Sequence, residues 1–125
     1  MTKRTIIKLF IILVLSTLSF TGFMLKLPRV FSHCDKELHF LFYFCAAFTL
    51  NYLIDKKTIG KHILIAYVLF MCGLFIEVAQ EFSNHFFERR IHGNFDIEDI
   101  IYNFRGLLTF TVVWFAYRIW KNSCR

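Results

Sequence analysis

Apolar residues along this chain fall into four long runs separated by polar connections. The runs predict helical spans over about residues 6–25, 38–54, 62–80 and 100–120. Each holds roughly 20 residues, which at about 1.5 Å per residue is the length needed to cross a hydrocarbon layer about 30 Å thick. We therefore expect an all-α membrane protein, a bundle of four transmembrane helices that forms a single domain over residues 1–125.

The first and third runs each leave a question about their limits. A basic start followed by the run at 6–25 could also be a signal peptide, but no small-x-small cleavage site follows it, so an uncleaved span is favoured. In the third run the strictly apolar part, Ile63–Ile76, has only 14 residues. We expect its helix to continue through Glu77 and Gln80, with a polar connection over Glu81–Phe95.

Individual residues mark where the helices begin and end. Pro28, the only proline in the chain, is expected to end the first helix because it cannot continue the backbone hydrogen bonding. Ser32 or Asp35 can cap the second helix through a side-chain oxygen. Asp96 is the candidate cap of the fourth helix, with Asp99 in the first turn, where negative charge is favoured.

The composition favours a membrane protein over a soluble one. Apolar residues make up 57% of the chain, and phenylalanine alone supplies 17 residues. A soluble chain of this size has too little interior to hide that much apolar surface, whereas a bilayer absorbs it. The net charge of +6 could indicate nucleic-acid binding, but the basic residues are scattered between apolar runs. We expect the lipid bilayer, and not nucleic acid, as the partner.

The distribution of basic residues predicts the orientation in the membrane. With four spans, nine of the 15 lysines and arginines lie on the side of the two termini and six lie on the other side. The positive-inside rule then places both termini in the cytoplasm.

Polar side chains form one stripe on each of the last three predicted helices. Helical spacing of three or four residues puts the members of each stripe on one face. The stripes are Asp35–His39–Tyr43 with Lys36 to one side, Glu77–Gln80, and Asp96–Asp99–Asn103–Gly106. Alternating passage brings all three to the outer membrane face, where each lies beside a small residue that allows close packing. We interpret them as one shared buried polar site; the alternative is that they are separate interfacial residues.

The cysteines and histidines predict no metal site. The four cysteines, at positions 34, 45, 72 and 124, form no C-x-x-C pair, and the two inside apolar runs suit small apolar fillers. His85 and His92 are seven residues apart in a polar connection, without a metal-binding pattern. We expect neither a metal nor a cofactor.

Three short motifs resemble the VanZ-like family of bacterial membrane proteins. They are D-K-E-L-H-F-L-F-Y at residues 35–43, E-V-A-Q at 77–80 and D-I-I-Y-N-F-R-G at 99–106. The family pattern also has an arginine about six residues before the last motif; that place holds Gly93 here, so Arg90 or Arg89 is the expected counterpart. A second family glycine, four residues after Gly106, is replaced by Phe110.

The resemblance implies a role in the bacterial cell envelope, in the inner membrane, since the named member of the family is connected to resistance to the glycopeptide teicoplanin. We expect a protein that affects glycopeptide susceptibility or the handling of envelope precursors, with a lipid-linked cell-wall precursor or a lipid headgroup as ligand. The residues expected to form its ligand-binding or structural cluster are Asp35, Lys36, His39, Tyr43, Glu77, Gln80, Arg90, Asp96, Asp99, Asn103 and Gly106.

Two other functions stay open at this point. A membrane-embedded enzyme acting on a lipid-linked or phospholipid substrate could use acid/base chemistry from carboxylates and a histidine. Its candidate catalytic residues are Asp35, His39, Glu77 and Asp99, although no nucleophile motif accompanies them. A proton pathway is disfavoured, because the polar residues stop at one face and the cytoplasmic halves of the helices look dry.

Overall fold

The structure, a computed structural model, is all-α and contains four helices. It describes residues 2–24, 34–54, 58–88 and 94–124. The helices are α1 (Lys3–Met24), α2 (Asp35–Leu53), α3 (Ile59–Phe86) and α4 (Ile97–Ser123). The predicted all-α architecture with four helices is confirmed.

Three of the four helices, α1, α3 and α4, are long and apolar enough to cross a membrane. The remaining helix, α2, has 19 residues and begins with Asp35, Lys36 and Glu37, so its apolar stretch is shorter. The prediction of four membrane-length spans is therefore confirmed for three of them. Three such helices in a chain of 125 residues favour a membrane protein.

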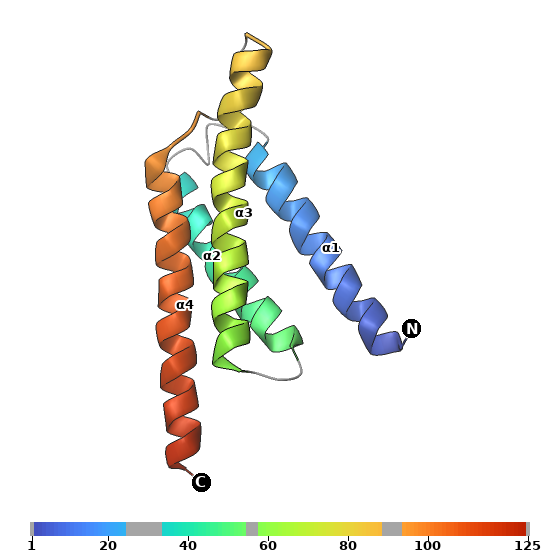
Figure 1. The fold of residues 1–125 in the computed structure, drawn as a ribbon, viewed down its shortest axis with the longest axis vertical. Coiled ribbons are helices and arrows are strands. Elements are labelled where there is room, and N and C mark those ends of the chain that lie inside the picture. Colours follow the sequence, from blue (N-terminus) through green and yellow to red (C-terminus); the bar gives the residue numbers. More distant parts are fainter. Residues whose placement is uncertain (1, 25–33, 55–57, 89–93, 125) are drawn as a thin grey trace.

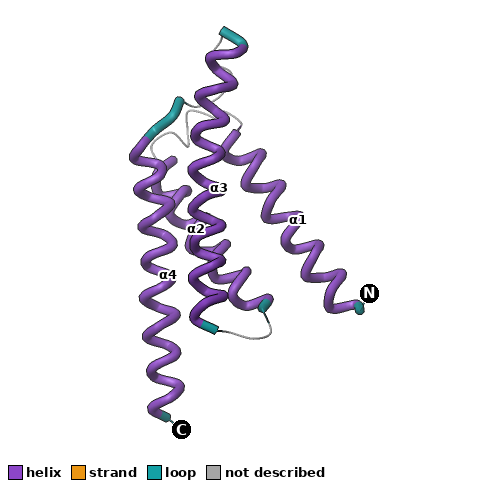
Figure 2. The backbone as a smooth tube through the Cα atoms, in the orientation of Figure 1, coloured by secondary structure: helices purple, strands orange, loops and turns teal. Residues whose placement is uncertain are grey.

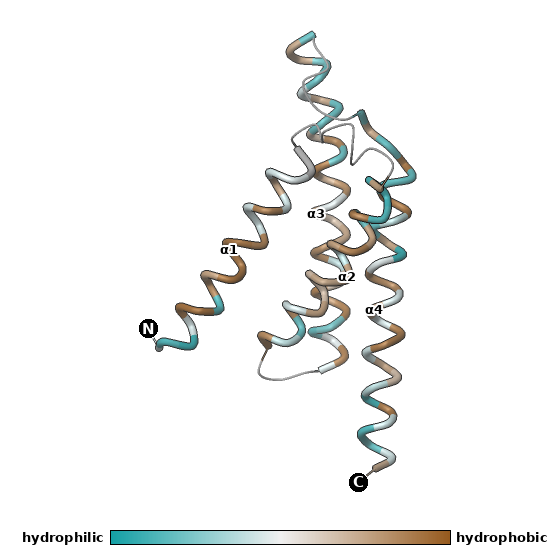
Figure 3. Tube along the Cα trace, turned by 180° about the vertical axis from the view of Figure 1, so that it is seen from behind, coloured by the Kyte–Doolittle hydropathy of each residue, from teal (hydrophilic) through white to brown (hydrophobic). Residues whose placement is uncertain are grey.

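Successive helices run in opposite directions. Figure 1 shows the end of α1, the start of α2, the end of α3 and the start of α4 near one end of the molecule, while both chain termini lie toward the other. In Figure 2, the described residues outside the helices form short loop segments at the helix ends. Figure 3 shows hydrophilic residues where α3 ends and α4 begins. This arrangement gathers the polar helix ends that carry the three predicted stripes.

The packed core is built from α2, α3 and α4. In Figure 1, α1 leans away from the other three helices, and none of its side chains within the described residues is buried. The centre of the core consists of Tyr43, Ala47, Leu107, Phe110 and Trp114. Instead of the expected four-helix bundle, three helices pack together and α1 lies beside them. The apolar side chains of α1 are exposed along most of the helix.

Phe110 is part of this core, although it occupies the position where the VanZ-like pattern has a glycine. Its ring meets Phe44 and Phe48 edge to face, with centroids 5.7 and 6.1 Å apart. Edge-to-face packing of this kind adds stability beyond the buried area alone. A large side chain therefore packs at the turn of α4 where the VanZ-like pattern has its second glycine.

Each helix begins about three residues before its predicted span, and two differences at helix ends concern residues near the polar stripes. Residues 81–86, assigned to a polar connection, continue α3, where Phe82 stacks on Phe86 one turn later. The cap residue of α2 is Cys34, which makes no side-chain cap bond, while Asp35 is the first helical residue. Ser32, the other candidate, lies outside the described residues. The predicted cap of α4 is confirmed, since the Asp96 side chain accepts a hydrogen bond from the Glu98 backbone.

Candidate functional site

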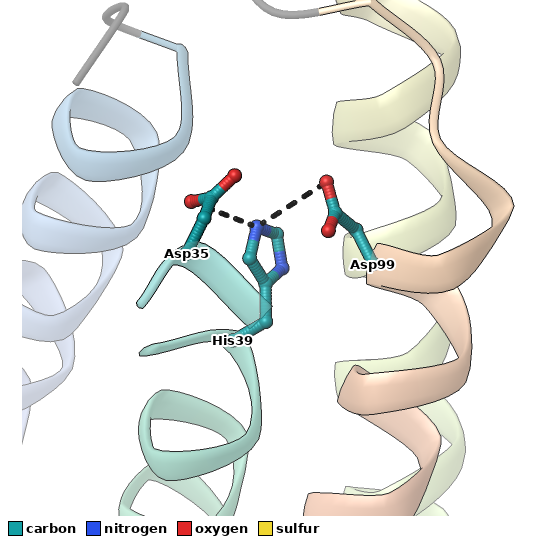
Figure 4. Close-up of side chains that lie close together, drawn as sticks. All are labelled: Asp35, His39 and Asp99. Carbon is teal, nitrogen blue, oxygen red and sulfur yellow. Dashed lines mark ion pairs between the residues drawn. The ribbon is translucent and has the colours of Figure 1, made fainter. Parts of the chain in front are cut away.

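His39 is buried at the polar end of the bundle, between carboxylates from two helices. Its Nε2 lies 3.7 Å from Asp99 Oδ2 on α4 and 4.0 Å from Asp35 Oδ1 on α2. Figure 4 shows the imidazole between the two carboxyl groups. Asp35 precedes His39 by four residues, so one turn of α2 places both on the same face.

Asn103 of α4 orients this imidazole. The Nδ1 atom of His39 is 2.8 Å from Asn103 Oδ1, and because an amide oxygen only accepts, Nδ1 donates the proton. The second ring nitrogen, Nε2, therefore turns toward Asp35 and Asp99. The hydrogen bond joins residues 64 positions apart and ties α2 to α4.

The stripe of α3 meets the other two helices through Gly73. A β-carbon built at Gly73 would lie 2.6 Å from the Tyr43 hydroxyl and 2.9 Å from Asn103 Nδ2. Only a residue without a side chain lets α3 approach this closely. Tyr43 of α2, Gly73 of α3 and Asn103 of α4 therefore meet at this point of the core.

Glu77 lies one turn beyond Gly73 and is 1% exposed. Its Oε2 accepts a hydrogen bond from the backbone N–H of Asp96, 3.2 Å away. One turn further, Glu81 accepts from the backbone of Phe95 at 3.3 Å. Two carboxylates of α3 therefore hold the segment that leads into α4, where backbone donors and the helix dipole favour negative charge. Gln80 is also buried on this face of α3.

A surface ion pair joins the rim of the site. Lys36 of α2 pairs with Glu98 of α4, and both side chains are partly exposed. Helical spacing puts Glu98 and Arg105 on the face of α4 opposite the polar stripe, which suggests that they pair with each other or with headgroups. The structure instead pairs Glu98 with Lys36, because the start of α4 lies against the start of α2. Arg105 instead places its guanidinium 5.0 Å from the centre of the Tyr102 ring.

Carboxylates outnumber cations in the described part of the cluster. Glu77, Asp96 and Asp99 join Asp35 there, whereas the cation Lys36 is paired with Glu98. The expected family arginine, Arg90 or Arg89, lies outside the described residues. Asp99 Oδ1 is buried and, among the residues that the structure covers, has no hydrogen-bond partner. A buried carboxylate oxygen without a partner is costly, so this position favours a hydrogen-bond donor or a cation.

A second polar cluster lies at the opposite end of the three-helix core, which the sequence suggested to be dry. His62 of α3 is 2% exposed; its Nδ1 is 3.0 Å from Asn51 Oδ1 and its Nε2 is 3.0 Å from Thr111 Oγ1. The imidazole also stacks on Trp114 with ring centroids 4.4 Å apart. On sequence grounds these were single polar residues, two near the ends of apolar runs and Thr111 in the middle of one, which is too weak a signal to predict a contact.

Each side chain of this second cluster has hydrogen-bond partners in the fold. Asn51 Nδ2 donates to the Ala47 carbonyl at 2.8 Å, and the Thr111 hydroxyl, which has a single proton, lies 2.8 Å from the Leu107 carbonyl and 3.0 Å from His62 Nε2. Its role is therefore to join α2, α3 and α4. The His39 cluster differs, because it includes the half-exposed Asp35 and a carboxylate oxygen, Asp99 Oδ1, that has no hydrogen-bond partner within the described residues.

The arrangement around His39 can support two kinds of chemistry. An imidazole with one nitrogen fixed by Asn103 and the other directed at carboxylates can exchange protons. The same imidazole and carboxylate atoms can also act together as ligands. Comparison with protein-family models, curated proteins and solved structures finds no match for this chain. The VanZ-like resemblance stays a prediction that rests on the three motifs.

Proposed function

We propose that this chain is a VanZ-like protein of the bacterial inner membrane that crosses the bilayer four times, with both termini in the cytoplasm. Three helices of spanning length, the nine-to-six distribution of basic residues and the three motifs support this proposal. The shorter helix α2 supplies the fourth crossing. Its polar residues His39 and Asn51 are buried in the bundle, which removes them from contact with lipid.

Reporter fusions test this topology. We expect alkaline phosphatase to be active, and green fluorescent protein to be dark, when inserted at residues 26–33 or 89–93. Fusions at either terminus or at residues 55–57 are expected to show the opposite pattern, because the basic residues favour the cytoplasm there. An odd number of crossings between Asp35 and Asp99 would contradict the proposal, since the two residues would then lie on opposite sides.

We further propose that the His39 cluster binds the polar part of an envelope lipid or lipid-linked cell-wall precursor at the outer leaflet, and thereby affects teicoplanin susceptibility or precursor handling. The observation that carries this proposal is a gradient of exposure at the end of the bundle. The Asp35 side chain is 40% exposed, whereas the side chains of His39 and Asp99 beneath it are 6% and 11% exposed. A headgroup that carries hydrogen-bond donors or a positive charge would meet the carboxylate acceptors at these helix ends.

A susceptibility assay with matched variants tests the ligand proposal. We expect the wild-type chain, expressed in a susceptible bacterium, to change the minimum inhibitory concentration of teicoplanin or the pool of lipid-linked precursors. Asp35→Asn is expected to abolish that change while leaving the amount of protein in the membrane unaltered, because a half-exposed side chain contributes only about 0.5 kcal/mol to stability.

Glu37→Gln is the matched control, because Glu37 is an exposed carboxylate in the same turn of α2, outside the cluster. We expect it to behave as the wild type. A wild-type chain without effect on susceptibility and precursor pools, or an Asp35→Asn chain as active as the Glu37→Gln control, would contradict the proposal.

A membrane-embedded enzyme for a lipid-linked or phospholipid substrate is the second candidate. It is favoured by one observation, the Nε2 edge of His39 facing two carboxylates while Asn103 holds the other nitrogen. In the same assay, lipid extracts analysed by mass spectrometry separate the two functions. New lipid products that disappear in Asp35→Asn would indicate catalysis, whereas an altered susceptibility or precursor pool without any new lipid product would indicate binding.

A further inference from the structure

We propose that Asp35, His39 and Asp99 form a binding site for a divalent transition-metal ion of the Zn²⁺ or Mn²⁺ class. The sequence predicted no metal, because neither the cysteines nor His85 and His92 have metal-binding spacing, and Asp35, His39 and Asp99 come from two different helices. In the structure, one donor atom from each lies within 4.8 Å of the other two. The proposal does not depend on the headgroup ligand proposed above.

The hydrogen bond from His39 to Asn103 determines which atoms face the site. Because Nδ1 donates its proton to Asn103 Oδ1, the neutral ring has its lone pair on Nε2. That lone pair is directed at two carboxylates, which also present lone pairs. Among the described residues, these three acceptors face one another, and they repel unless a proton or a cation lies between them. Metal-binding histidines in proteins usually donate their other N–H to an oxygen in this way.

The distances fit an ion better than direct hydrogen bonds. Separations of 3.7 and 4.0 Å from Nε2 to the carboxylate oxygens are too long for hydrogen bonds. Ligands about 2.0–2.2 Å from one ion are roughly 3–4 Å apart. A small inward movement of the half-exposed Asp35 side chain would bring all three donors into this range.

Asp99 supplies independent support for a bound cation. The residue is 8% exposed, and its Oδ1 is buried without a hydrogen-bond partner among the described residues. Glu77, Asp96 and Asp35 add negative charge nearby, while Lys36 is paired with Glu98. An ion at this point would satisfy the carboxylate and reduce the repulsion within the cluster.

The donor set indicates the class of metal. One imidazole nitrogen and two carboxylates suit Zn²⁺ or Mn²⁺ better than soft ions, which prefer thiolates, or Ca²⁺, which prefers six or more oxygens. Three protein ligands leave at least one position open, as in metal sites that also bind water or a ligand. The exposed side of Asp35 places that open position toward the end of the bundle.

Metal titration of the full chain tests the site. The protein is purified in detergent with a tag that lacks histidine, stripped with EDTA and titrated calorimetrically with Mn²⁺ or Zn²⁺ alone. The four cysteines, which are exposed, are replaced by serine to prevent binding through thiols. We expect about one ion per chain. Asp35→Asn is expected to weaken binding at least about tenfold, and Glu37→Gln is expected to bind like the parent protein.

Two further measurements assign the ligands. Nitrogen coupling from an imidazole is expected in the electron spin echo envelope modulation of bound Mn²⁺, and it should vanish in His39→Gln. Asp99→Asn is expected to raise the melting temperature in EDTA, because it removes a buried unpaired charge, and to lose the further rise that metal gives the parent protein. If Asp99 only packed the helices together, Asp99→Asn would not both raise the melting temperature in EDTA and lose the rise that metal produces.

The proposal is overturned by any of three results. They are no metal binding by the parent protein, equal affinity in Asp35→Asn and Glu37→Gln, and bound Mn²⁺ without nitrogen coupling. Because these measurements use no lipid and no antibiotic, a negative result leaves the headgroup proposal standing. A negative susceptibility assay likewise leaves the metal site standing.

Discussion

Gly106→Ala is expected to separate α2 from α4 and to lower the free energy of unfolding by about 1–3 kcal/mol, as overpacking of a core does. A β-carbon at Gly106 would lie 2.4 Å from the carbonyl oxygen of Phe40, with the Phe40 carbonyl carbon and the Phe44 nitrogen each at 3.2 Å. All three atoms belong to the α2 backbone, which cannot rotate away as a side chain can. The two helices must therefore move apart.

The same substitution is expected to disturb the His39 cluster. His39 directly precedes Phe40, and Asn103 lies one turn before Gly106, so a wider gap between the helices stretches the 2.8 Å hydrogen bond between them. Loss of that bond frees the imidazole to rotate away from Asp35 and Asp99. Stability and function are thus expected to fail together in Gly106→Ala.

Thermal unfolding in detergent, followed by circular dichroism and by tryptophan fluorescence, measures the effect. Trp114 is buried against His62 and reports on the core. Gly60→Ala and Gly22→Ala are the controls, because a β-carbon at either position meets no atom within 4 Å. Alanine is the better helix former by about 1 kcal/mol, so the controls are expected to be neutral or slightly stabilised. Equal melting temperatures for Gly106→Ala and Gly60→Ala would refute the prediction.

Glu77→Ala is expected to have the second large effect, a loss of about 1–3 kcal/mol that reflects a buried donor left unsatisfied. Glu77 is 1% exposed, and its carboxylate accepts the Asp96 N–H at 3.2 Å. Alanine leaves that N–H without its acceptor and opens a cavity next to Gly73. The start of α4 is then expected to fray, which hydrogen exchange of the backbone at residues 96–99 would detect.

Two variants separate the causes of this loss. Glu81→Ala removes an equivalent bond, to the backbone of Phe95, but from an exposed side chain that water can replace. It is expected to change stability by no more than about 0.5 kcal/mol. Glu77→Gln keeps an acceptor oxygen and is expected to recover part of the stability. If Glu81→Ala destabilised the protein as much as Glu77→Ala, burial would not explain the effect.

If Glu77→Gln folds normally but abolishes the effect on teicoplanin susceptibility or precursor pools, the negative charge of Glu77 is needed for function and not for folding. If it folds and functions normally, Glu77 serves the structure through its hydrogen bond alone. Glu77 was a candidate catalytic residue on sequence grounds, and this comparison decides between the two roles.

Features that depend on neighbours within one helical turn were predictable from the chain. The four helices follow from apolar runs of sufficient length, and the cap at Asp96 follows from a side-chain oxygen two residues before the Glu98 N–H that it accepts. The stripe of Asp35 and His39 follows from a spacing of four residues. These features are predictable because the residues that interact to produce them are close together in the sequence.

Contacts between helices were predictable only as a meeting of stripes and not as specific pairs. The sequence placed Glu98 with Arg105 or headgroups, whereas the structure pairs it with Lys36. It ended the helical part of the third run near Gln80, whereas α3 continues to Phe86, with Glu81 bonded to the backbone before α4. In both cases the deciding partner lies on another element.

By itself, the sequence determined that four helices form, where the last of them is capped, and which helix faces are polar. Only the tertiary structure decided that α1 stands beside a three-helix core, that His62 joins Asn51 to Thr111, and that His39 faces two carboxylates while Asn103 holds its other nitrogen. The physical reason is distance along the chain. Helix formation and capping are settled within a few residues, whereas His39 and Asn103 are 64 residues apart and meet only when Gly106 lets α4 pack against α2.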